Sequence, residues 1–457
     1  MLRKRFLTIG LSLLLVTIMA ACVAAPVATT PPAAGEAAAV EVQSAEPAAV
    51  APEAEAVTLQ FWTWFPPLPI TEKIIAAFEA ENPGINVEVT ILESTVYQDK
   101  LPLSLAGGEA LDLVAIQTGA MVNQVKDELM PLEPLLNEYV GADWASRYNE
   151  KAVAQSRALA DDGDLYILPM GGLGSVVGYY NVEILAEYGL TVPTTNEEFK
   201  AFAADLKAQN PDMLPVVFTG ANWFQDEILL TLVGQTSPSF FNDIRYGDGK
   251  WNDPVYVQAL KEYKQMYDDG ILSMDAIDLD YSRSLEIFYS GEAAILLQGT
   301  WEAGVLSESF RQDSGIELAD VGLMPLPLMT GAGTPSIRSF IDLGIAVPHN
   351  AAHPAEAMKL LEFMVLGNGV DVWAPAFILV PGKVGYELPA SALTSDAARA
   401  GYATLVDLVQ NPASDRNNVS AFSAVVGDGI IEVLNGADAQ EVADALQAEW
   451  ESGRYAQ

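Results

Sequence analysis

The alternation of strand-like and helix-like segments at 57–92 constrains the fold of this chain more than any other feature. Residues 57–62 alternate as in a strand, and apolar residues of 71–78 then share one face of a helix. Asn82-Pro83-Gly84 stops this helix, and 85–92 alternate again as a second strand. Two strands joined through a helix require a crossover connection, so the segment predicts a parallel strand pair.

The same alternation recurs further along the chain. It predicts strands at 111–116, 214–218 and 293–297, and helices at 199–206 and 254–268. Strands and helices in alternation are typical of α/β domains, in which helices cover a largely parallel sheet. The chain has 457 residues, 50% of them hydrophobic, which exceeds one ordinary domain, so we expect two α/β lobes.

The first residues form a segment of a different kind. Three basic residues at 3–5 precede a mostly apolar run, 6–19, and then small residues. This order is typical of a secretory signal, and the run is shorter than the ~20 residues that span a bilayer. The motif Met19-Ala20-Ala21-Cys22 resembles a bacterial lipobox with Met in its first position. The resemblance implies a signal peptide at 1–21, cleavage before Cys22, and lipid attached to its sulfur.

A low-complexity segment follows this cysteine. Residues 22–56 are nearly all Ala, Pro, Val, Thr and Glu, a composition that cannot bury a core and indicates a tether. Cys22 is the only cysteine, so no internal disulfide is possible. We expect a lipid-anchored body on the extracytoplasmic face of the cell membrane; the alternative is an ordinary signal peptide with an incidental cysteine.

The charge of the chain excludes one class of partner. The formal net charge is −38, and such a surface repels nucleic acid and argues against anionic partners. Most of these carboxylates fit a solubility surface, and no sequence motif for a cofactor or for catalysis is present. We expect no cofactor, no metal site and no enzymatic activity.

Aromatic and polar residues stand together where four predicted strands end. The four ends are Trp62-Thr63-Trp64, Gln117-Thr118, Asn222-Trp223-Phe224 and Gln298-Gly299-Thr300-Trp301. In open α/β sheets, ligands bind beyond the carboxyl ends of the strands. Flat rings beside amides and hydroxyls suit a ligand with apolar C–H faces and a rim of hydroxyl groups, which describes a sugar.

Several motifs in a fixed order resemble one protein family. In order, they are FWTWF, INVEVTIL, GDLYILPM, VGYYNVEILAEYGLTVPTTNEEF, WNDPVYVQALKEYKQMYDDGIL, FYSGEAAILLQGTWE and GIAVPHNAAHPAEAMKLLEFM. This sequence resembles the extracellular solute-binding proteins of family 1, the carbohydrate receptors of ABC importers that include maltose-binding protein. The resemblance covers about 57–375 and departs at Ala110-Leu111, where the family usually has Pro-Asp.

The resemblance implies a type II periplasmic-binding-protein fold with a ligand cleft between two lobes. The expected N-terminal lobe is 57–168 with 301–347, and the expected C-terminal lobe is 169–300 with 348–457. Segments that cross between the lobes are expected near 167–171, 298–301 and 346–350, with Gly171 and Gly299 as hinge residues. The implied partners are a carbohydrate ligand and the permease subunits of an ABC transporter, with the protein acting as a monomer.

Candidate ligand-binding residues follow from the strand ends and the family resemblance together. Those expected to stack on sugar rings are Trp64, Trp223, Trp301 and Trp373, and those expected to bind hydroxyl groups are Gln117, Gln298, Arg338 and Asp342. Two roles stay open at this stage. Trp62 fits either core or cleft, and Trp373 fits either lobe packing or ligand contact.

Other chemistries fit parts of the sequence less well. The adjacent phenols of Tyr179 and Tyr180 suggest ferric-iron capture, and the negative charge suits a polyamine or peptide ligand. A secreted glycosidase needs two acids about 5–9.5 Å apart in the cleft. The only histidines, His349 and His353, have a spacing that ligates metals on a helix, but prolines flank them.

Replacement of the lone cysteine tests the anchor. Cys22→Ser removes the acceptor of the lipid, so we expect the protein to leave the membrane fraction and appear in the soluble extracytoplasmic fraction. Immunoblotting of separated fractions measures this. Unchanged membrane association of the variant would contradict a lipid anchor on Cys22.

Overall fold

The computed structural model describes residues 56–118, 120–329, 333–412, 414–415 and 420–455. Cys22, the signal segment and most of the tether lie outside these residues. Residues 54–457 form one compact unit. No helix within the described residues is long and apolar enough to cross a membrane.

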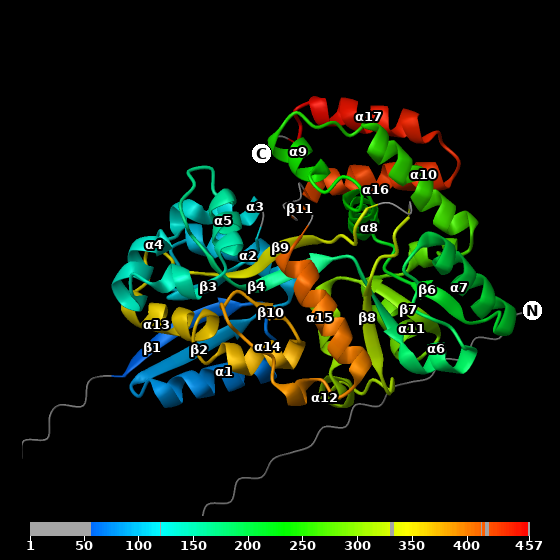
Figure 1. Cartoon of the computed structure of the whole chain (residues 1–457). Coiled ribbons are helices and arrows are strands. Elements are labelled where there is room, and N and C mark those ends of the chain that lie inside the picture. The colour runs from blue at the N-terminus through cyan, green and yellow to red at the C-terminus, as the bar shows by residue number, and fades with distance from the viewer. Residues whose placement is uncertain (1–55, 119, 330–332, 413, 416–419, 456–457) are drawn as a thin grey trace, which may run out of the picture. The chain divides into compact units, whose positions relative to one another are not determined.

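A seven-stranded mixed sheet forms the first half of the structure (Figure 1). Its strands are β1 (Val57–Thr63), β2 (Ile85–Ile91), β3 (Leu113–Ile116), β4 (Leu168–Ser175), β9 (Arg338–Ala346), β10 (Val380–Pro381) and β11 (Ser414–Asp415). β1 pairs in parallel with β2 and β3, as the crossover pattern at 57–92 predicts. β9 is antiparallel to both β3 and β4, and the long β4–β9 ladder pairs Gly171 with Asp342 and Ser175 with Arg338.

The first hydrophobic core packs on this sheet. Its helices are α1 (Leu68–Glu81), α2 (Ser94–Ala106), α3 (Ala120–Val125), α4 (Leu132–Leu135), α5 (Glu150–Ala158), α13 (Pro354–Val365) and α14 (Val370–Phe377). α1 begins at Leu68, three residues before the start of the predicted helical face at Thr71. The Thr71 hydroxyl is buried and donates to the Pro66 carbonyl at 2.7 Å, so it fastens the turn that enters the helix.

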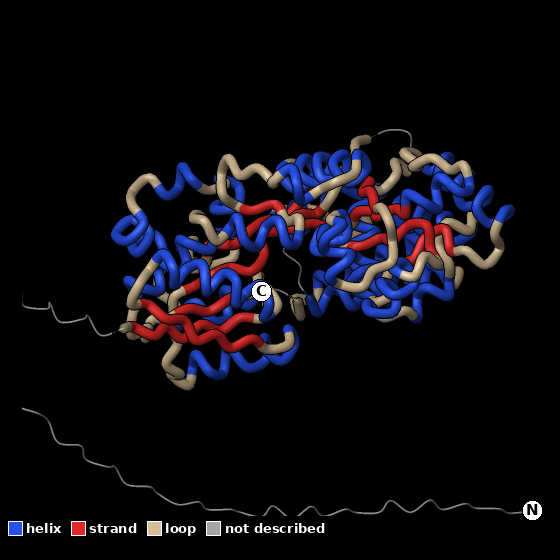
Figure 2. Tube along the Cα trace, turned by 90° about the horizontal axis from the view of Figure 1, so that it is seen from below, coloured by secondary structure: helices blue, strands red, loops and turns tan. Residues whose placement is uncertain are grey.

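A four-stranded sheet forms the second half, in the order β6 (Leu214–Val217), β7 (Ala293–Gln298), β5 (Val177–Asn181) and β8 (Val321–Pro325). Every residue of β7 is buried. Ile295 and Leu297 belong to one core and Leu296 to another, because both faces of the sheet are covered. Figure 2 shows the strands of the two sheets in separate groups, with helices around each.

The helices of the second half divide between the two faces of this sheet. The first core there holds α6 (Val182–Tyr188), α7 (Asn196–Gln209), α8 (Asn222–Gly234), α9 (Phe240–Tyr246), α10 (Pro254–Asp268), α16 (Ser420–Leu434) and α17 (Ala439–Glu451). The other holds α11 (Tyr281–Tyr289), the 3-10 helix η5 (Thr300–Leu306) and α15 (Asp396–Gln410), with α12 (Glu308–Asp313) following η5. A threonine caps the N-terminus of α7, since the Thr195 hydroxyl accepts from the Glu198 N–H.

The connections between the two sheets differ from the expected crossings. The first lies at 175–177, between β4 and β5, rather than at 167–171. The second is 326–337, between β8 and β9. Residues 298–301 join β7 to η5 within the second half, and 346–350 lead from β9 to α13 within the first. A strand that ends in polar residues therefore does not by itself mark a passage between lobes.

The expected division into lobes also differs from the packing, because the chain passes between the sheets at other points than expected. β8 pairs in the second sheet, although 301–347 was expected in the N-terminal lobe. α13 and α14 pack on the first core, although 348–457 was expected in the C-terminal lobe. Each half of the structure is therefore built from several separate stretches of the chain.

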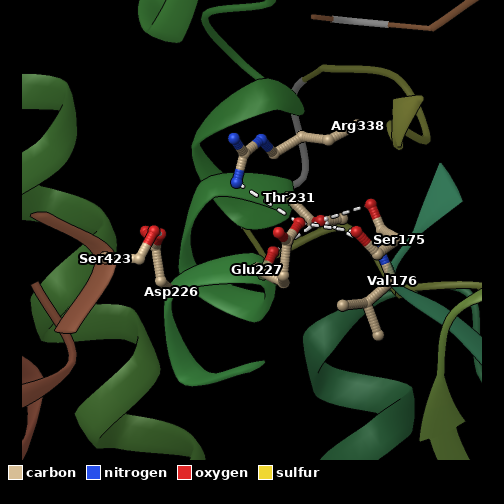
Figure 3. Close-up of polar contacts among 7 residues, drawn as sticks. All are labelled: Ser175, Val176, Asp226, Glu227, Thr231, Arg338 and Ser423. Atoms are coloured by element: carbon tan, nitrogen blue, oxygen red, sulfur yellow. Dashed lines mark hydrogen bonds and ion pairs between the residues drawn. The ribbon is translucent and has the colours of Figure 1, made fainter. Parts of the chain in front are cut away.

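A buried polar network holds the two connections together (Figure 3). Glu227 of α8 accepts a hydrogen bond from the Ser175 hydroxyl at 2.5 Å and lies 3.3 Å from an Arg338 guanidinium nitrogen. The Glu227 and Arg338 side chains are 0% and 1% exposed. Thr231 of the same helix accepts from the Val176 N–H and donates to the Ser175 carbonyl. The last residue of β4 and the first of β9 are therefore fixed to one helix.

Loss of one partner of this buried ion pair should destabilise the fold. Arg338→Met leaves the Glu227 carboxylate buried without its cation, and we expect the free energy of unfolding to fall by about 3–5 kcal/mol. The double variant Arg338→Met/Glu227→Gln removes both charges and should recover part of this loss. Denaturant titration measures both. A single variant within about 0.5 kcal/mol of wild type would contradict a structural role for the pair.

Candidate functional site

An aromatic pocket of about 160 Å³ lies where both halves of the structure contribute side chains. Its walls come from the end of β1, the middle of β4 and β9, the region of α14, and η5. The lining residues are Trp64, Phe65, Met170, Gly171, Gly172, Leu173, Trp301, Asp342, Leu343, Trp373 and Leu379. Three indole rings and one carboxylate thus converge on one small volume.

Four of the eight predicted ligand-binding residues line this pocket. Trp64 follows β1 and packs against Tyr97, with ring centroids 5.2 Å apart. Trp301 lies in η5, and Asp342 lies in β9. Trp373 of α14 is 1% exposed, and its indole N–H donates to the Met364 carbonyl at 2.9 Å. Trp373 therefore both packs in the first core and forms part of the pocket wall.

Trp223 lies next to the pocket rather than in its wall. Its ring is 36% exposed, and its centroid is 6.3 Å from that of Trp301, at an interplanar angle of 44°. Trp223 stands in the first turn of α8, one turn before Glu227. The two rings extend the aromatic surface beyond the lining residues.

Three predicted hydroxyl-binding residues do not line the pocket. Arg338 is buried against Glu227, and its guanidinium carbon lies 4.4 Å from the ring centroid of Phe241. Gln298 is 0% exposed in β7, and its side-chain oxygen accepts from the Gly299 N–H at 3.1 Å. Gln117 follows β3 and is half-buried outside the pocket wall.

The two glycines predicted as hinges have close neighbours instead. A Cβ on Gly171 would meet the Val380 carbonyl oxygen, and a Cβ on Gly299 would meet the ring of Trp301. Gly299 has φ −80° and ψ 168°, a conformation open to any residue, and it joins two elements of the same half. Its lack of a side chain makes room for the indole ring, which is a packing role.

Thr300, the neighbour of Trp301 at this strand end, is 1% exposed. Its hydroxyl accepts from the Gly174 N–H at 2.9 Å. This bond ties η5 to β4, which lines the other side of the pocket. Thr300 therefore fixes the position of Trp301 relative to the pocket strands.

Asp342 and Leu343 form an unusual stretch of the pocket wall. Leu343 has φ 52°, in the left-handed region that side chains rarely adopt. The Asp342 carboxylate accepts from the Leu343 N–H at 2.8 Å, which supports this conformation. Backbone strain of this kind clusters at ligand sites, so it marks Asp342 as a candidate polar contact.

A larger pocket of about 410 Å³ touches the same two strands. Its lining includes Ser339 and Ile341 of β9, with Lys151 of α5 and Gln410 of α15, and no aromatic side chain. Ser339 and Ile341 of β9 line this pocket and not the aromatic one, Asp342 and Leu343 line the aromatic pocket and not this one, and Gly172 of β4 lines both. The wall of this larger pocket therefore offers no ring for stacking, whereas the aromatic pocket has three indoles.

The geometry disfavours the metal-based alternatives. Tyr179 and Tyr180 are neighbours on β5 and point to opposite faces of the sheet, so they cannot hold one ion together. The Tyr179 hydroxyl donates to the Gly299 carbonyl at 2.9 Å. Among the described residues, no group of three or more His, Cys, Asp or Glu is placed to hold a metal ion.

Comparison with known proteins identifies the family. The model of the bacterial extracellular solute-binding proteins matches residues 65–366. The chain belongs to this family. A binding protein of Brucella abortus (strain 2308) is 25% identical over 297 residues, which cover 65% of this chain and 68% of the relative.

Other solute-binding proteins extend the comparison. The multiple sugar-binding protein of Streptococcus mutans is 22% identical over 323 residues, which cover 66% of this chain and 69% of the relative. The solved structure of a chitin oligosaccharide binding protein aligns with a TM-score of 0.69 at 23% identity, covering 87% of this chain and 99% of that one. Both the family and the α/β architecture agree with the sequence analysis.

Sequence reasoning missed several residues of the pocket. Phe65, Met170, Leu173 and Leu379 contribute apolar wall, and only Phe65 and Met170 carried a signal, as members of the FWTWF and GDLYILPM motifs. Apolar residues other than Trp carry no sequence signal that separates a pocket wall from a core. The contribution of β4 depends on its register with β9, which the sequence of neither strand reveals.

A side chain at position 299 should displace the Trp301 ring. We expect Gly299→Ala to lower the free energy of unfolding by about 1–3 kcal/mol, as overpacking does. In a Trp301→Ala background the collision partner is absent, so the same substitution should cost much less. Thermal unfolding of the four proteins measures this difference. An equal cost in both backgrounds would contradict the packing role of Gly299.

Proposed function

We propose that this solute-binding protein captures a sugar or oligosaccharide in the aromatic pocket and delivers it to the permease of an ABC transporter. The observation that carries the proposal is the convergence of Trp64, Trp301 and Trp373 with Asp342 in one pocket. Indole faces cover the C–H faces of a pyranose ring, and a carboxylate binds its hydroxyl groups. Trp223 extends the stacking surface for a second sugar unit.

The functions of several relatives support a carbohydrate ligand. They include a multiple sugar-binding protein and a melibiose/raffinose/stachyose-binding protein. The solved structures with the same fold include a chitin oligosaccharide binding protein. These proteins differ in their sugars, so the proposal here is the class of ligand and not one sugar.

The pocket suits binding more than hydrolysis. A glycosidase of the usual kind places two carboxyl groups about 5–9.5 Å apart around the scissile bond. Among the lining residues, Asp342 is the single carboxylate. We therefore propose capture and release without covalent chemistry, with closure of the two halves around the ligand as the main conformational step.

The hinge of this closure is proposed at the connections between the sheets. The residues at 175–177 and 326–337 join the four-stranded to the seven-stranded sheet, and Glu227 fixes one end of each. We also propose that the protein acts as a monomer on a lipid anchor at Cys22, outside the cytoplasmic membrane. The family is extracellular, and one relative is the lipoprotein LipO of Bacillus subtilis (strain 168).

A panel of sugars tests the class of ligand. We expect maltotriose, raffinose, chitotriose or xylotriose to raise the melting temperature, because a ligand at 100 times its Kd stabilises by about 2.7 kcal/mol. Spermidine and ferric citrate are the controls for the alternative ligands. A response to a control alone would contradict the proposal, as would the absence of any response to a broad set of oligosaccharides.

Truncation of Trp301 tests the site. Trp301→Ala should weaken binding of the best sugar by about 2 kcal/mol, or roughly thirtyfold, while costing little stability without ligand. The matched control is Trp251→Ala, since Trp251 is 1% exposed within a core, and there we expect a stability loss of about 3–5 kcal/mol. Titration calorimetry and thermal melting decide. If Trp301→Ala melted like Trp251→Ala and still bound sugar, Trp301 would be core.

A further inference from the structure

A buried tyrosine of α2 joins the ends of two strands that lead toward the aromatic pocket. Tyr97 is 0% exposed, and its hydroxyl lies 3.0 Å from the Trp62 carbonyl oxygen and 2.6 Å from the Ala115 carbonyl oxygen. Trp62 belongs to β1 and Ala115 to β3. A phenol has one proton to donate, so the two carbonyl oxygens share it. One side chain therefore cross-links two neighbouring strands.

The cross-link lies where the backbone pairing of these strands ends. The ladder between β1 and β3 pairs Phe61 with Leu113, and its last pair is Trp62 with Val114. Burial raises the pKa of the Tyr97 hydroxyl, so this group stays protonated and remains a donor. The hydroxyl thus extends the connection between the strands beyond their last backbone pair, two residues before Trp64.

The turn that follows β1 is held from its other side as well. The Thr63 side chain is 0% exposed, and its hydroxyl donates to the Phe65 carbonyl at 2.5 Å. The same hydroxyl accepts from the Phe65 N–H at 3.2 Å. The backbone before and after Trp64 is therefore fixed by side-chain hydrogen bonds, and the neighbours of the indole decide how its ring is oriented.

Tyr97 is also one of those neighbours. The centroids of the Tyr97 and Trp64 rings are 5.2 Å apart, and the ring planes meet at 49°. This separation lies within the range of about 4.5–7 Å at which aromatic pairs attract each other. Trp64 lines the aromatic pocket, whereas Tyr97 does not. Trp64 therefore contacts a buried ring of the core and is itself part of the pocket wall.

We propose that Tyr97 is a positioning residue for ligand recognition: its ring packs on the Trp64 indole, and its hydroxyl fixes the strand ends from which that indole projects. Because Tyr97 is buried and does not line the pocket, the role is indirect. The inference rests on the proposed capture of sugar by this pocket. It adds that affinity depends on a phenol hydroxyl that does not touch the sugar.

The matched pair of variants is Tyr97→Phe and Tyr263→Phe. Tyr263 is also 0% exposed, and its hydroxyl donates to the Gln225 side chain in a different core from the one that holds Tyr97. Each variant keeps a buried ring and loses one hydroxyl. We expect Tyr97→Phe to weaken binding of the best oligosaccharide by about fivefold, and Tyr263→Phe by less than about twofold. Titration calorimetry measures the affinities, and thermal melting verifies that each variant is folded.

A double-mutant cycle separates positioning from general stability. In a Trp64→Ala background, Tyr97→Phe should leave the remaining affinity unchanged, because the ring that it positions is absent. A purely structural role for Tyr97 would instead give the same loss of affinity in both backgrounds. Equal losses in the two backgrounds would overturn the inference, as would equal effects of Tyr97→Phe and Tyr263→Phe in the wild-type background.

A measurement without ligand reports the position of the Trp64 ring directly. Fluorine NMR of protein labelled with 5-fluorotryptophan gives a resonance for each of the eight tryptophans, and its loss in Trp64→Phe assigns the one from Trp64. We expect Tyr97→Phe to broaden, split or shift this resonance, because the indole then samples other orientations. The same resonance should be unchanged in Tyr263→Phe.

The two measurements also separate this inference from the proposed function. If the wild type bound no sugar, the proposed function would fall, whatever the NMR spectrum showed. If sugar bound while the Trp64 resonance of Tyr97→Phe stayed as in the wild type, only the inference would fall.

Discussion

The buried ion pair between Arg338 and Glu227 is the interaction on which the arrangement of the two sheets depends. It lies at the end of one connecting strand and the start of another, and the Ser175 hydroxyl completes it. Breaking a pair buried this deeply leaves an uncompensated charge, so the two strands and α8 stay together. β4 ends at Ser175 and β9 begins at Arg338, so the ion pair fixes the position of one end of each pocket strand.

The pairing of β4 with β9 sets the geometry of the pocket. The pairing of Gly171 with Asp342 brings together the middle of β4 and the middle of β9, and η5 is then tied to β4 through Thr300. Trp301 and Asp342 are therefore placed relative to each other by backbone pairing and one side-chain hydrogen bond. A pocket built in this way has its acid and its central ring placed by strand pairing and a short helix.

Local sequence pattern predicted some of the residues that line the aromatic pocket. Strand ends rich in Trp pointed to Trp64 and Trp301, and the order of the motifs identified the family and its α/β architecture. Sequence pattern did not predict which polar side chains are buried, because contacts between residues far apart in the chain decide this. Arg338 looked like a free hydroxyl partner because Glu227, its counter-ion, lies 111 residues earlier in the chain. Gln298 looked exposed because its strand seemed to end at the cleft, whereas β7 remains covered on both faces.

Helix α8 carries both an aromatic ring at the edge of the pocket and the acid that holds the connections. Trp223 and Glu227 are four residues apart, about one helical turn or 6 Å along the axis. One turn of an α-helix is stiff, so the distance between Trp223 and Glu227 is fixed. The Trp223 ring is therefore joined to Ser175 and Arg338 through one helical turn and the Glu227 side chain, with no loop between them. If ligand contacts this ring and the lobes pivot at these connections, as proposed, contact and pivot are rigidly linked.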